Sequence, residues 1–112
     1  MNNLSVLQVC EEIKNTRNTY SVLAKIVEET GELATEIAIA NGDSYKLQGS
    51  DGVVGEAIDV IASCVDLIYI QVRKDLPDIT LEQIDQLMDA VMVQKLDKWK
   101  RKVAEQEQKN AI

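Results

Sequence analysis

The sequence predicts an all-α fold, a single four-helix antiparallel bundle, and three observations lead to this prediction. Apolar residues recur with helical periodicity along most of the chain. There is only one proline and there are five glycines, so few positions interrupt a helix. Few β-branched residues alternate with polar ones as a strand would require. With 112 residues, the chain fits one domain spanning 1–112.

The first two predicted helices span residues 4–14 and 20–40, separated by a polar turn. The second ends at Asn41-Gly42, because either residue tolerates the left-handed conformation that stops a helix. A loop follows over 43–50, and Ser50 or Asp51 is expected to cap the third helix.

The third predicted helix spans residues 52–74 and stops before Pro77. The fourth begins at Thr80, where Gln83 three residues later completes a capping-box pattern. After about residue 104 the tail is polar and is expected to fray. Short connections make such helices antiparallel neighbours. Their apolar faces exceed what one small bundle covers, so we expect a homodimer or homotetramer.

Composition excludes several function classes. The formal net charge of −7 argues against a nucleic-acid partner. The absence of histidine excludes a Ser-His-Asp triad and the usual catalytic zinc sites. No apolar window of about 18 residues lacks charges, so no membrane partner is expected. Without a signal-peptide pattern, and with Cys10 and Cys64 interpreted as buried free thiols, the expected location is cytoplasmic.

The third predicted helix is apolar around nearly its whole circumference, which is typical of a buried helix. Three acids interrupt it, Glu56, Asp59 and Asp66, within an arc of about 80°. A buried carboxylate needs a partner, since it otherwise takes up a proton. No lysine or arginine lies on the apolar stretch 53–72, so the partners must come from another helix or from a bound cation.

The second predicted helix carries Glu29, Glu32 and Glu36 on one face, with Glu28 at its flank. Gathering Glu29 and Glu32 against Glu56 and Asp59 is strongly unfavourable without compensation. A hard divalent cation with oxygen ligands, Mg²⁺ or alternatively Mn²⁺, resolves this repulsion. The alternative is a solvated acidic face without a metal.

The run from Lys25 to Glu36, with Glu28-Glu29-x-x-Glu32 followed by small apolar residues, resembles the signature helix of the MazG-like all-α nucleoside triphosphate pyrophosphohydrolases. Glu56-Ala-Ile-Asp59 is similar to the Glu-x-x-Asp element of that family. The resemblance covers residues 20–74 well and the fourth helix loosely.

This resemblance implies Mg²⁺-dependent hydrolysis of a (deoxy)nucleoside triphosphate to a monophosphate and pyrophosphate, in nucleotide-pool housekeeping. Carried over, the metal ligands are Glu29, Glu32, Glu56 and Asp59. Glu28 and Glu29 are the candidate catalytic residues, with Glu28 orienting or deprotonating the attacking water. Positioning and charge neutralisation are what phosphoryl chemistry requires.

Basic residues must offset the acidic charge if a triphosphate binds. Candidate phosphate contacts are Lys25, Lys95, Lys98 and Arg101, and the only tryptophan, Trp99, either stacks on a base or covers the core. The asparagine-plus-arginine ending of some family members is absent. Two other functions stay open: a phosphoribosyl-ATP pyrophosphohydrolase-like enzyme, and a non-catalytic helical interaction module.

Overall fold

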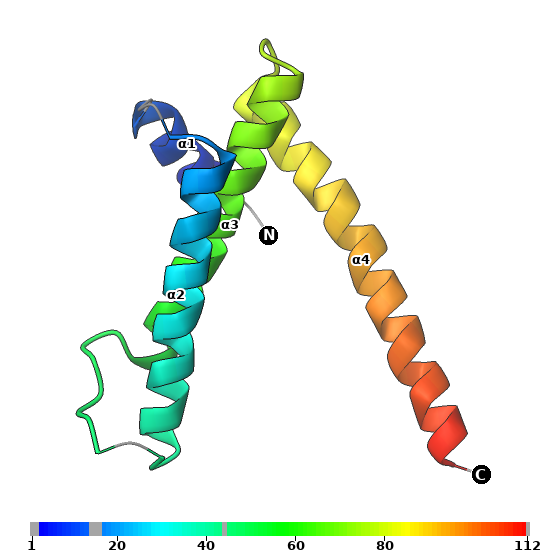
Figure 1. Ribbon diagram of the computed structural model, residues 1–112. Helices are drawn as coiled ribbons and strands as arrows, with labels where there is room; N and C mark the ends of the chain where they lie inside the picture. The colour runs from blue at the N-terminus through cyan, green and yellow to red at the C-terminus, as the bar shows by residue number, and fades with distance from the viewer. Residues whose placement is uncertain (1–2, 14–16, 44, 112) are drawn as a thin grey trace.

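Four helices make up the protein in a computed structural model that describes residues 3–13, 17–43 and 45–111 (Figure 1). They are α1 (Leu4–Ile13), α2 (Thr19–Ala40), α3 (Gly52–Asp75) and α4 (Leu81–Asn110), and no strand occurs in these ranges. The predicted all-α class with four helices is confirmed. The predicted end of the first helix at Lys14 lies outside the described residues.

The caps explain where two of the helices begin. Asn18 accepts a hydrogen bond from the Ser21 amide, and the Ser21 hydroxyl oxygen accepts one from the Asn18 amide, so a capping box starts α2. Thr80 and Gln83 form the predicted capping box of α4. That helix continues to Asn110, so the polar end expected to fray is helical.

The packing is uneven. α2 and α3 lie side by side over most of their length, whereas α1 packs across α3 and the start of α4 (Figure 1). The small core, Leu7, Cys10, Val65, Tyr69 and Ile84, lies at this three-helix junction. Both cysteines are free thiols, but only Cys10 is buried as expected, whereas Cys64 is partly exposed. Burial raises the pKa of the Cys10 thiol to about 12.

α4 diverges from α2 and α3 instead of completing an antiparallel bundle (Figure 1). The radius of gyration is 17.5 Å, against about 13 Å expected for a compact chain of this size. The helix is exposed from Ala90 onward. Because its apolar stripe continues beyond that point, the stripe has too few partners within one chain.

The third helix is also less buried than its apolar sequence predicts. Val54 is 75% exposed and Ile58 is 55% exposed, although Val65 and Tyr69 are buried. The outer apolar side of α3 therefore faces solvent in the single chain. Among the described residues, no helix combines the length and apolar character needed to cross a membrane.

Candidate metal centre

Carboxylates from α2 and α3 meet where the two helices pack. Glu29 and Glu32 of α2 and Glu56 of α3 each place one carboxylate oxygen within 4.8 Å of the other two. Residues three apart lie on the same face of a helix, so the two α2 acids point together toward α3. The structure thus brings together three of the four acids singled out in the sequence.

The fourth acid, Asp59, belongs to a second group that shares Glu56. Asp51, Glu56 and Asp59 place one carboxylate oxygen each within 4.8 Å of one another. Asp59 follows Glu56 by three residues on α3, and Asp51 stands just before the helix. The two groups together form a five-carboxylate cluster, consisting of Glu29, Glu32, Asp51, Glu56 and Asp59.

Two oxygens of this cluster are buried without a hydrogen-bond partner among the described residues: Oε2 of Glu29 and Oε2 of Glu56. Glu29 is only 6% exposed. An unpartnered polar atom removed from water costs about 1–3 kcal/mol, and more when it is charged. Several carboxylate oxygens with spare coordinating capacity are the donor set that Mg²⁺ or Mn²⁺ takes, so these residues fit such an ion.

The pKa values at the cluster reflect unrelieved repulsion. The negative charge of Glu29 is the main cause that raises the pKa of Glu32. Burial raises the pKa of Glu56, and the charges of Glu32 and Asp59 add to that effect. The carboxylates therefore repel one another in the folded chain.

Lys25 forms an ion pair with one carboxylate of the cluster. Its Nζ lies 2.9 Å from Oε1 of Glu29, one helical turn away on α2. The bond to Glu29 is the main cause that raises the pKa of Lys25, which keeps the ammonium charged. Glu28 is exposed beside Glu29, so its carboxylate is accessible to water.

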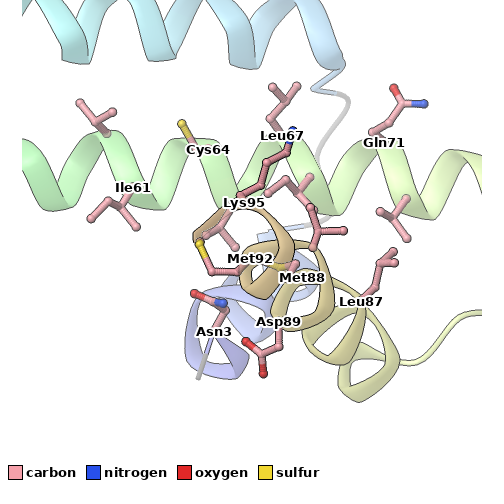
Figure 2. Close-up of a pocket in the computed structure, with 15 residues that line it drawn as sticks. Asn3, Ile61, Cys64, Leu67, Gln71, Leu87, Met88, Asp89, Met92 and Lys95 are labelled. Carbon is pink, nitrogen blue, oxygen red and sulfur yellow. The ribbon is translucent and has the colours of Figure 1, made fainter. Parts of the chain in front are cut away.

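The candidate phosphate contacts on α4 are not gathered at the cluster within one chain. Lys95 lines a groove between α3 and α4 (Figure 2), and Arg101 pairs with Asp97 of its own helix at 3.2 Å. Lys98 is exposed, and Trp99 is 66% exposed rather than covering the core. Their roles stay predictions that the single chain does not test.

Two acids on the predicted acidic faces have other partners. Asp66 forms an ion pair with Arg17, which lies just before α2. Glu36 is buried, and its Oε1 accepts a hydrogen bond from the Gly49 amide at 2.5 Å. Glu36 thus ties the loop after α2 to the helix. Asp51, in contrast, was expected only as a helix cap, and its place in the cluster was not predicted.

Comparison of the chain with known protein families, with curated proteins and with solved structures finds no match. The resemblance to the MazG-like enzymes thus rests on the residues of the two motifs.

Proposed function

We propose that this protein is a Mg²⁺-dependent nucleoside triphosphate pyrophosphohydrolase of the MazG-like type. The observation that carries the proposal is the convergence of Glu29, Glu32, Glu56 and Asp59, with two buried oxygens that have no partner among the described residues. Such a cluster is costly unless a ligand compensates it. A structural role alone gives no reason to gather these charges between two helices.

In the proposed hydrolysis, different residues bind the metal, activate the water and hold the phosphate. Glu29, Glu32, Glu56 and Asp59 would hold Mg²⁺, which, when bound, neutralises charge on the triphosphate. Glu28 orients a water and accepts its proton as the water oxygen attacks the α-phosphorus. The bond from that phosphorus to the bridging oxygen breaks, and pyrophosphate leaves with the electron pair. Lys25 is placed to hold a phosphate oxygen, because its ammonium already lies at the cluster.

We further propose that the chain acts as a homodimer or homotetramer. The groove between α3 and α4 has a volume of about 770 Å³, and its lining includes Ile61, Ile68, Val91 and Met92. Figure 2 shows this lining, in which polar groups are few. A second copy of the chain, carrying the same surplus of apolar helix surface, is the occupant that this groove fits. Such packing could also bring four residues of α4 close to the carboxylates of a neighbouring chain: Lys95, Lys98, Trp99 and Arg101.

The direct test measures pyrophosphate release from a panel of canonical and modified (deoxy)nucleoside triphosphates, and from phosphoribosyl-ATP, with Mg²⁺. We expect turnover with at least one nucleoside triphosphate and none when the metal is chelated. Glu32→Gln and Asp59→Asn should abolish it while leaving the helical circular-dichroism signal intact. Asp43→Asn, which removes one negative charge from the loop after α2 outside the cluster, is the matched control.

Three outcomes would count against this assignment. Turnover of phosphoribosyl-ATP alone would change the substrate class and keep the reaction type. No turnover with any substrate at high enzyme concentration would favour a non-catalytic interaction module. Full activity in both Glu32→Gln and Asp59→Asn would reject the ligand assignment.

A further inference from the structure

The side chain of Asp51 sits where a helix cap is expected but does not act as one. Asp51 occupies the N-cap position of α3, and its carboxylate makes no capping hydrogen bond. The residue has helical backbone angles, φ −88° and ψ −22°, and the next residue, Gly52, has a positive φ of 63°. Caps with an extended backbone, as at Asn18 and Thr80, use their side chains instead.

The carboxylate of Asp51 turns toward α3 and reaches Glu56 and Asp59. One oxygen of each of these three side chains lies within 4.8 Å of the others. The carboxylate therefore adds to the repulsion in the cluster.

Gly55 provides the space that this arrangement needs. A Cβ atom at Gly55 would overlap the Cβ of Asp51 and lie 3.0 Å from its Cγ. Any larger residue at position 55 would push the Asp51 side chain out of its place beside Glu56. A glycine in the first turns lowers the stability of a helix relative to alanine, yet here it leaves room for the Asp51 side chain.

We propose that Asp51 is a fifth carboxylate ligand of the metal centre, completing with Glu56 and Asp59 a second divalent-cation position next to that of Glu29, Glu32 and Glu56. This inference rests on the proposed function for the existence of the centre. The independent sign of a ligand at this position is Oε2 of Glu56, which is buried and has no hydrogen-bond partner among the described residues. Glu56 belongs to both groups, so its carboxylate would be shared between the two positions.

The test is a calorimetric titration of the full chain with Mn²⁺ alone, without nucleotide, on the wild type and matched variants. The wild type is expected to bind two Mn²⁺ per chain. Asp51→Asn should weaken one of these two by at least about tenfold, since even residues that only orient a ligand cost about 10- to 100-fold. Gly55→Ala should have the same effect, because it displaces the Asp51 carboxylate without removing it. Asp43→Asn, equal in charge to Asp51→Asn, should bind Mn²⁺ like the wild type.

The outcomes separate this inference from the proposed function. If Asp51→Asn and Gly55→Ala both bind Mn²⁺ like Asp43→Asn, Asp51 is not a ligand and the four-carboxylate centre stands. If the wild type binds no Mn²⁺, both proposals fail. If binding depends on Asp51 but no triphosphate is hydrolysed, the metal position stands and the enzymatic function falls. A helical signal unchanged in each variant confirms that the comparison concerns folded protein.

Discussion

Arg17 clamps the carboxylate of Asp66: its Nη2 lies 2.6 Å from Oδ1 and its Nε lies 2.9 Å from Oδ2. Both side chains are mostly buried, and Arg17 also donates to the carbonyl of Cys10. The pair therefore joins α3 to α1 and to the start of α2. Although Asp66 shares the acidic face of α3 with Glu56 and Asp59, its charge is already compensated, and it is a structural residue.

Asp66→Asn should accordingly lower stability and spare metal binding. Loss of a charged partner in a mostly buried pair leaves Arg17 underbonded, so we expect the free energy of unfolding to fall by about 1–3 kcal/mol. Urea denaturation followed by circular dichroism measures this. Asp97→Asn is the matched control, because the Asp97–Arg101 pair is exposed and worth at most about 0.5 kcal/mol. Equal effects in the two variants would contradict the structural role of Asp66.

Gly31 of α2 and Gly55 of α3 should respond differently to alanine. A Cβ at Gly31 would have no atom within 4 Å, so Gly31→Ala should stabilise the metal-free chain by about 1 kcal/mol through helix propensity. Gly55→Ala should gain less or lose stability, because the side chain of Asp51 must move. Denaturation midpoints of the two variants measure the difference. A loss of stability at Gly31 would instead reveal that another molecule covers this face.

Stability of the metal-free protein should depend on pH through the acidic cluster. The pKa values of Glu32 and Glu56 are raised above their usual 4.5, so the folded state binds protons more tightly than the unfolded state. Their contribution is most favourable below pH 4.5 and is lost as pH rises through the raised values. The double variant Glu32→Gln/Glu56→Gln should thus exceed the wild type in melting temperature at pH 7.

That difference in melting temperature should shrink as the pH is lowered toward 4.5 in the presence of a chelator. At pH 7, added Mg²⁺ should raise the melting temperature of the wild type but not that of the double variant. A difference between variant and wild type that is constant with pH would show that the two carboxylates do not repel.

Self-association should depend on the α3–α4 groove. Sedimentation velocity is expected to find the wild type as a dimer or tetramer. Ile61→Glu places a charge in the groove lining and should shift the protein toward monomer. Gln94→Glu adds the same charge to α4 outside that lining and should leave the assembly unchanged. A wild-type monomer at all concentrations would contradict the expected assembly.

Helix positions were largely predictable because local signals set them. The second helix was expected over 20–40 and spans Thr19–Ala40, and the third was expected over 52–74 and spans Gly52–Asp75. The capping residues and the proline after α3 carry this information. The divergence of α4 was not predictable, since periodicity shows which face is apolar but not whether the same chain covers it.

The sequence predicted which acids share one side of α3, but it did not predict which of them lie at the same level along the helix. Asp66 lies within the same arc as Asp59, yet seven residues correspond to about 10 Å of rise, which brings it level with Arg17 instead of the cluster. The place of Asp51 in the cluster was not predicted, because it depends on the direction of its side chain. A single sequence does not reveal whether an aspartate before a helix bonds to the helix or turns away from it. The structure shows that Asp51 makes no capping hydrogen bond and that its side chain lies against Gly55.

All five clustered carboxylates lie between residues 29 and 59, on one helical hairpin. These contacts join two helices that follow each other in the sequence, so the repulsion arises whenever the hairpin closes, with or without α4 and a second chain. A divalent cation that relieves this repulsion as the hairpin closes should speed up refolding as well as stabilise the folded protein.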